Sequence, residues 1–261
     1  MAQVLQQHDS SSSSGSEDGG CCADQHGDLK GPVAAQPAYI RQGFVRKVYS
    51  LLTMQLLLTI AIVYPIVTTL KRTWVLQHMA LYYAASFGSL TAVICVSCCC
   101  QSVARKFPMN YFFLFFVTVC MSITTGFLCT FYTISSVLQA LTATALVFAA
   151  LTAFACCTNI DFTGCGIFLY AGLMAMIMYG FTVMLWSMFA PIPPWVKTLM
   201  GLLGVLLFSM YIVYDTQLII GGRHKKNQFE VDEYVFAALN LYLDIINLFI
   251  YMLQLMGNRE S

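Results

Sequence analysis

The chain has 261 residues, of which 59% are hydrophobic and 10% charged, and its formal net charge is +1. A soluble domain carries nearer a quarter charged residues, so this chain has too few to cover a water-facing surface. The near-neutral charge argues against a nucleic-acid partner. These features indicate a membrane protein with many spans.

The N-terminal segment, 1–38, is rich in Ser and Gly and poor in apolar side chains, so it is predicted to be a disordered cytosolic tail. No apolar core follows the first Met closely, so we expect no cleavable signal peptide, and the first span should serve as its own signal anchor. The transmembrane domain is predicted over 39–257, with a short C-terminal tail at 258–261.

Seven apolar stretches are long enough to cross a bilayer, which takes about 20 helical residues. They lie near 48–70, 79–100, 111–132, 134–157, 165–190, 197–220 and 234–256. The sequence therefore predicts an all-α membrane protein, a bundle of seven transmembrane helices. The alternative is six spans followed by a re-entrant C-terminal segment.

Lys and Arg near the ends of the spans give the orientation, because they are enriched on the cytosolic side. With a cytosolic N-terminus, that side carries eight of them: Arg41, Arg46, Lys47, Arg105, Lys106, Arg223, Lys225 and Lys226. The other side carries four: Lys71, Arg72, Lys197 and Arg259. A multi-pass protein with its N-terminus in the cytosol is predicted.

The eleven cysteines suggest no disulfide framework, since most lie inside or at the ends of apolar stretches. In the predicted orientation, five of them end spans on the cytosolic side: Cys98, Cys99, Cys100, Cys156 and Cys157. One interpretation is that these are small apolar residues in membrane helices. The other is that they are juxtamembrane sites of S-palmitoylation.

Two acidic residues lie inside predicted spans, Asp215 in the sixth and Asp244 in the seventh. An Asp at the centre of a membrane helix costs roughly 2.5–3.5 kcal/mol on insertion, so such residues are functional candidates by default. At 1.5 Å per residue, Asp215 lies about 7–8 Å and Asp244 roughly 15 Å from the cytosolic ends of their spans. Adjacent antiparallel helices would bring the carboxyls close, where they would share a proton.

The seventh span also carries a polar stripe at helical spacing, made of Asn240, Asp244, Asn247, Tyr251 and Gln254. Spacings of four and three place these residues on one helix face. That face either lines a hydrated path or binds helices together without any solute. A second, gentler stripe of small side chains in the third span is interpreted as a close-packing face: Thr118, Ser122, Thr125 and Cys129.

A closed path through such a bundle needs a basic partner for the carboxyls, and Arg105 after the second span is the best candidate. The alternative is that Arg105 anchors a helix end at the lipid headgroups. No nucleophile elbow, P-loop or HExxH pattern occurs. The Tyr214–Asp215 pair matches half of an intramembrane aspartyl protease signature, but "LYLD" at Asp244 does not match the other half. We expect no enzyme and no cofactor.

The membrane part of the chain resembles the transmembrane BAX-inhibitor-motif family, and within it the Lifeguard branch. The similar segments follow in order from the first span to the last: "FVRKVYSLLTMQLLLTIAIV", "RKFPMNYFFLFFVTVCMSITTGF", "VLQALTATALVFAALTAFA", "DFTGCG", "YDTQLIIGGRHK" and "EYVFAALNLYLDIINLFIYMLQL". The Ser-rich tail is shorter than the N-terminus of many Lifeguard relatives. Some relatives also have an acidic residue in the second helix, where this second span has none.

The resemblance implies a seven-helix bundle whose last helix is central. It also implies a pH-sensitive calcium leak from internal stores that restrains apoptosis, with Asp215 and Asp244 as the pH sensor and transient calcium contacts. Arg105 would then pair with Asp215 in the closed state. The Golgi or endoplasmic reticulum is the expected membrane, with the plasma membrane or an endolysosome as alternatives.

A different class of function stays open on the residues alone. The chain would then be a non-conducting membrane scaffold that inhibits apoptotic signalling by contacting death receptors or apoptosis regulators. This class is favoured if the polar stripe only packs helices and the aspartates only pin them together. In either class the membrane lipids are partners, and calcium is the permeating ion only in the first.

Overall fold

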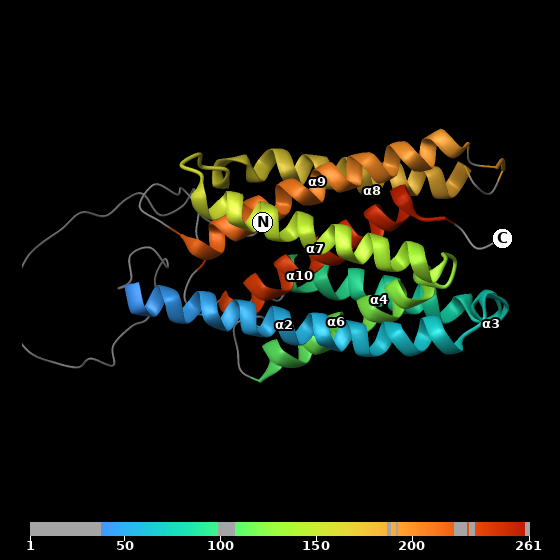
Figure 1. Cartoon of the computed structure of the whole chain (residues 1–261), viewed down its shortest axis with the longest axis horizontal. Coiled ribbons are helices and arrows are strands. Elements are labelled where there is room, and N and C mark those ends of the chain that lie inside the picture. The colour runs from blue at the N-terminus through green and yellow to red at the C-terminus, as the bar shows by residue number, and fades with distance from the viewer. Residues whose placement is uncertain are drawn as a thin grey trace, which may run out of the picture.

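The computed structural model describes residues 38–98, 108–186, 189–191, 193–221, 229 and 233–258. The helices are α2 (Ala38–Thr69), α3 (Arg72–Gln77), α4 (Met79–Cys98), α6 (Met109–Cys129), α7 (Ile134–Cys157), α8 (Gly166–Trp186), α9 (Pro194–Ile220) and α10 (Tyr234–Met256), with a 3₁₀ turn at Thr163–Cys165. The predicted all-α bundle is confirmed (Figure 1).

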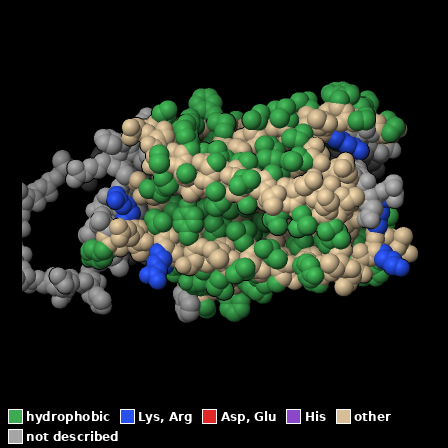
Figure 2. Space-filling view, viewed as in Figure 1, with side chains coloured by type: hydrophobic (Ala, Val, Ile, Leu, Met, Phe, Trp, Pro, Cys, Tyr) green, Lys and Arg blue, Asp and Glu red, His purple; other side chains and the backbone are tan. Residues whose placement is uncertain are grey.

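Within the described residues, six helices are long and apolar enough to cross a membrane, and Met79–Ile94 is a shorter apolar helix. These match the seven stretches expected from the sequence. The last stretch is one unbroken helix of 23 residues rather than a broken re-entrant segment. Figure 2 shows hydrophobic side chains over the middle of one face and Lys and Arg near its two ends, as a bilayer requires.

The first span differs from its predicted start, because α2 begins at Ala38 and not near residue 48. Apolar content defined the predicted start, and the polar residues Arg41, Arg46 and Lys47 lie before the apolar part. The backbone hydrogen bonds of the helix continue through these residues, since Lys and Arg are good helix formers. The helix is therefore longer than the apolar stretch.

Local sequence signals explain several helix ends. Thr133 caps α7, its hydroxyl accepting a hydrogen bond from the Ser136 N–H. Pro194 occupies the first position of α9, where a missing N–H costs nothing. At the other end of α9, Gly221 has a φ of 61°, a conformation that glycine adopts without steric cost.

α10 is the central helix of the bundle. It packs most extensively against α9 and also against α2, α7 and α6. In Figure 1 it runs between α9 on one side and α2 on the other. Its buried residues, such as Leu241 and Tyr242, form the middle of the main hydrophobic core. The prediction of a central last helix is confirmed.

Candidate functional site

The carboxyl groups of Asp215 and Asp244 contact each other inside the bundle. Asp215 lies on α9 and Asp244 on α10, and their side chains share a hydrogen bond. They are only 4% and 6% exposed, respectively. A hydrogen bond between two carboxyls requires a proton on one of them, so the contact describes a pair that shares a proton.

One oxygen of this pair has no ordinary hydrogen-bond donor. The Oδ2 atom of Asp244 is buried and accepts no hydrogen bond from an N–H or hydroxyl group of the described residues. Buried polar atoms are nearly always paired with protein or with ordered water, so an exception marks a place where a solute or a change of conformation satisfies the atom. The pair therefore retains an unused binding capacity.

Small residues let α9 and α10 approach closely enough for this contact. A Cβ atom on Gly204 would overlap the ring of Tyr251, and a Cβ on Gly201 would lie 3.5 Å from the Cβ of Leu255. Close approach at small residues is a common way for helices to pack in a membrane. The two glycines of the "MGLLG" segment thus let α9 approach α10 closely at two points three residues apart.

Aromatic side chains surround the pair. Tyr211, one helical turn before Asp215, lies close enough to interact electrostatically with both carboxyls. Its ring meets the ring of Tyr214 edge to face at 6.5 Å, and Phe208 stacks on Tyr251 at 5.7 Å. These rings exclude water from the α9–α10 contact, and a low dielectric strengthens the interaction between the two carboxyl groups.

The other members of the polar stripe on α10 make packing contacts. The Asn247 amide donates to the Leu243 carbonyl of its own helix at 2.8 Å. The Gln254 amide donates to the Lys197 carbonyl at the start of α9, at 3.2 Å. Tyr251 stacks on Phe208, and Asn240 is half-buried. The stripe thus contacts α9 through Tyr251 and Gln254, whereas the Asn247 amide bonds within α10 itself.

The structure shows a second polar cluster that sequence reasoning missed. On α2, the Gln55 amide donates to the Thr118 hydroxyl at 3.0 Å, and Thr59 lies 2.8 Å from the Tyr242 hydroxyl of α10. The Ser122 hydroxyl lies 3.0 Å from that of Thr59. All of these side chains are buried. Polar residues four apart within the first apolar span were the signal that could have found them.

The close-packing face predicted on the third span is buried, with all four members, Thr118, Ser122, Thr125 and Cys129, at most 2% exposed. It faces α2, since Gly126 beside it would place a Cβ within 2.9 Å of Ile66. This face therefore packs helices together and also supplies hydroxyls to the second polar cluster.

Several predicted site residues lie outside the described residues: Arg105, Cys99, Cys100 and the side chain of Cys98. The pairing of Arg105 with Asp215 thus stays a prediction. Cys156 and Cys157 are exposed at the end of α7, with free thiols. Their position suits acylation at a membrane boundary, which also stays a prediction.

Among the described residues, no group of three or more His, Cys, Asp or Glu side chains is placed to hold a metal ion. Calcium in a stable site takes 6–8 oxygen ligands. The two carboxyls supply only part of such a set, which suits a transient contact with a passing ion better than a resident metal.

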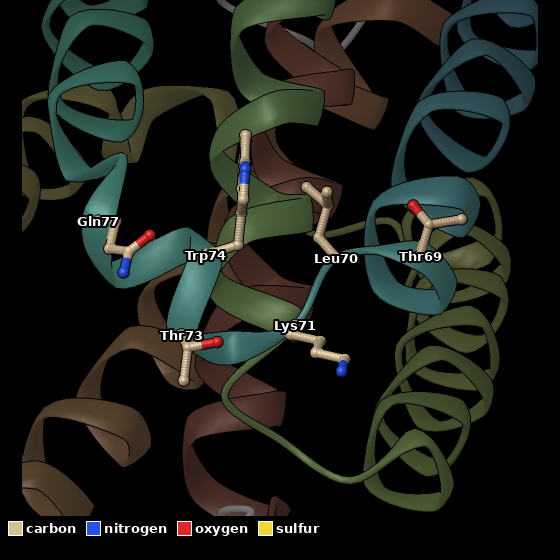
Figure 3. Close-up of a pocket in the computed structure, with 6 residues that line it drawn as sticks. All are labelled: Thr69, Leu70, Lys71, Thr73, Trp74 and Gln77. Carbon is tan, nitrogen blue, oxygen red and sulfur yellow. The ribbon is translucent and has the colours of Figure 1, made fainter.

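The hollow drawn in Figure 3 lies far from the carboxyl pair. It has a volume of about 360 Å³ and is formed where α2 joins α3, lined by residues that include Lys71, Trp74 and Gln77. Asp215 lies near the C-terminal end of α9. Because α9 runs in the opposite direction to α2, this end of α9 and the end of α2 are at opposite ends of the bundle (Figure 1). The hollow is a surface feature of the other membrane face.

Comparison with known proteins places the chain in a family. The family model described as "Inhibitor of apoptosis-promoting Bax1" matches residues 41–261. Human Protein lifeguard 3 is 34% identical over 237 residues, covering 89% of this chain and 74% of the relative. Mouse Protein lifeguard 4 is 34% identical over 223 residues, covering 85% of this chain and 87% of the relative. The chain therefore belongs to the BAX-inhibitor family of apoptosis-related membrane proteins, with Lifeguard proteins among its relatives.

Proposed function

We propose that this protein is a pH-sensitive calcium leak of intracellular membranes, which lowers the calcium content of a store and thereby restrains apoptosis. The observation that supports the proposal most directly is the buried contact between Asp215 and Asp244, in which Oδ2 of Asp244 has no N–H or hydroxyl donor among the described residues. A stability-optimised bundle would fill these positions with apolar side chains. Two acidic side chains instead meet between α9 and the central helix α10.

The same contact suggests how the leak responds to pH. When the pair shares a proton, the carboxyls hold α9 and α10 together and the path beside them is closed. Loss of that proton leaves two negative groups in contact, and their repulsion favours a conformation in which both reach water and attract calcium. Arg105 would pair with Asp215 in the closed state. No covalent chemistry is needed, and we expect no enzymatic activity and no cofactor.

The proposal places the protein in the Golgi or endoplasmic reticulum with its N-terminus in the cytosol. In that orientation α9 ends and α10 begins on the cytosolic side, so Asp215 lies a few residues from cytosolic water. The carboxyl pair then senses cytosolic pH, and the ion passes from the store towards the cytosol.

Calcium efflux from proteoliposomes tests the proposal. Purified protein would be reconstituted and efflux measured across pH for the wild type, Asp215→Asn and Asp244→Asn. Asp18→Asn, in the N-terminal tail, makes the same chemical change far along the chain and serves as the control. We expect a leak in the wild type and the control whose pH dependence is lost in both pair variants. The same pH dependence in all four proteins would contradict the assignment of the sensor.

A second candidate function is the non-conducting scaffold that contacts death receptors or apoptosis regulators. The observation in its favour is that Tyr251 and Gln254 contact α9 and that the Asn247 amide bonds to the Leu243 carbonyl of its own helix. Absence of calcium efflux from folded protein above that of empty liposomes would favour this function and reject the leak.

A further inference from the structure

The loop between α7 and α8 is bound to α9 by one side chain. The Oε1 atom of Gln217 accepts a hydrogen bond from the Phe162 N–H at 2.8 Å, and its Nε2 atom donates to the Ile160 carbonyl at 2.9 Å. Gln217 is only 1% exposed. The amide therefore uses both of its ends on the backbone of one loop, which fixes the distance and the angle between loop and helix.

A second contact holds the same face of α9. Tyr214 precedes Gln217 by three residues, so the two side chains lie on one face of the helix. The Tyr214 hydroxyl fits against Gly166 at the start of α8, where a Cβ atom would lie only 2.7 Å from it. The loop and the first residue of α8 thus contact α9 at two points one turn apart.

The loop is itself internally bonded. Oδ1 of Asp161 accepts hydrogen bonds from the Thr163 N–H at 2.9 Å and from the Thr163 hydroxyl at 2.6 Å. Thr163 is fully buried. A loop with fixed internal geometry transmits a displacement at one end to the other end, whereas a loose loop would absorb it.

Asp215 lies on the opposite side of α9 from Gln217. Two residues along an α-helix are a rotation of about 200°, so the side chain of Asp215 points away from the loop and towards α10. Gln217 therefore binds the loop on one side of α9, and Asp215 contacts Asp244 on the opposite side. A rotation of α9 about its axis would have to break both contacts.

We propose that Gln217 is a positioning residue for the carboxyl pair. By binding the segment 158–165 to the back of α9, it fixes the rotation of the helix at which Asp215 meets Asp244. Release of Gln217 lets α9 turn, which separates the carboxyls. The effect on the leak rests on the proposed function above, whereas the mechanical link between loop and pair does not.

The ionisable side chains around this part of α9 bear on any pH measurement. They are Asp244 from α10, Tyr170 from α8, Tyr49 from α2 and Asp161 from the loop, in addition to Tyr211 and Tyr214 of α9 itself. A tyrosine hydroxyl in water is neutral over the physiological pH range, so the carboxyls are the groups of this set that can carry charge there. Asp161 is the one carboxyl of this set that lies on the loop side of α9, away from the contact between Asp215 and Asp244.

The first experiment uses Gln217→Met in the full-length protein in lipid nanodiscs. Methionine has a similar length and lacks both hydrogen bonds. Gln139→Met is the matched control, because Gln139 is exposed near the start of α7, at the other end of that helix from this loop. We expect hydrogen exchange of the Phe162 amide to accelerate about tenfold in Gln217→Met and not in the control.

Calcium efflux from proteoliposomes then tests the positioning role. In Gln217→Met the midpoint of the pH dependence should shift by about half a pH unit, while Gln139→Met keeps the wild-type midpoint. Faster exchange at Phe162 with an unchanged midpoint would overturn the proposal, because Gln217 would then be only a structural tie. An efflux that is absent already in the wild type would reject the proposed function instead.

The reciprocal experiment decides the question without any leak, or where Gln217→Met fails to fold. Coupling between two sites acts equally in both directions. Asp215→Ala removes the contact with Asp244 and should accelerate exchange at Phe162 about threefold, whereas Asp215→Asn keeps a hydrogen bond and should restore the wild-type rate. The Thr133 amide, bonded to the Asn258 carbonyl at the other end of the bundle, reports global destabilisation. Unchanged exchange at Phe162 in Asp215→Ala would overturn the proposal.

Discussion

Asp244 of α10 hydrogen-bonds to Asp215 of α9 through its carboxyl group, yet its Oδ2 atom is buried with no N–H or hydroxyl donor among the described residues. An unsatisfied buried acceptor costs about 1–3 kcal/mol. The packing of α9 against α10 has to offset this cost through the apolar and aromatic contacts around the pair. The bundle is thus less stable than its apolar packing alone would make it.

The first prediction is that Asp244→Asn stabilises the protein. Asparagine stays neutral at every pH, and its amide group donates a hydrogen bond to Asp215 without needing a shared proton. We expect the free energy of unfolding to rise by about 1–3 kcal/mol at about pH 8, where loss of the shared proton of the wild-type pair is more favoured. The rise should be smaller at about pH 5. Thermal unfolding in detergent micelles at the two pH values measures it. Lower stability at both would mean that the carboxyl contact is itself a favourable bond between the helices.

The second prediction concerns the close approach of α9 and α10. Gly204→Ala would place a methyl group against the Tyr251 ring, whose Cδ2 atom would be 2.6 Å away. The helices must then separate, and we expect a loss of about 1–3 kcal/mol in thermal unfolding. Gly43→Ala on α2 is the control, because its new methyl group meets no atom within 4 Å among the described residues outside its own stretch of helix. That change should be neutral or stabilising, since alanine favours a helix.

The sequence predicted the carboxyl contact because it depends on quantities that a single chain reveals. Consecutive spans joined by a short connection are neighbours, and the distances of Asp215 and Asp244 from their span ends differ by about two turns at most. Both helices were long and strongly apolar, so their existence was the most secure part of the prediction. Among the predicted spans, helix ends were misplaced, most clearly the start of α2.

The contacts of Gln55 and Gln217 were not predictable in the same way. Gln55 bonds to Thr118, 63 residues later, and this pairing depends on which helices pack together. Gln217 bonds to backbone groups of the loop between α7 and α8. Any residue type supplies a backbone N–H or carbonyl, so the partner loop carries no signal in its side chains.

The third prediction tests the second polar cluster. Tyr242→Phe removes the hydroxyl that lies 2.8 Å from Thr59 and leaves the rest of the ring in the core. The cluster then contains a buried hydroxyl with one partner fewer, and we expect a loss of about 1–2 kcal/mol. Tyr64→Phe, at an exposed position of α2, is the control and should leave the unfolding temperature unchanged. Equal effects of the two changes would show that the cluster contributes no net stability.

The fourth prediction is that Gly166 and Tyr214 are energetically coupled. In Gly166→Ala the new methyl group would lie 2.7 Å from the Tyr214 hydroxyl, so the ring must move and we expect a loss of about 1–3 kcal/mol.

Tyr214→Phe removes that hydroxyl, and the ring carbon Cζ would then be the nearest atom at 3.2 Å, a distance that a small shift relieves. The double variant Gly166→Ala/Tyr214→Phe should consequently be more stable than the sum of the single changes predicts, by about 1 kcal/mol. Thermal unfolding of the four proteins of this cycle gives the coupling energy. A coupling near zero would mean that α8 and α9 adjust independently of each other, and that the start of α8 does not hold the face of α9 opposite Asp215.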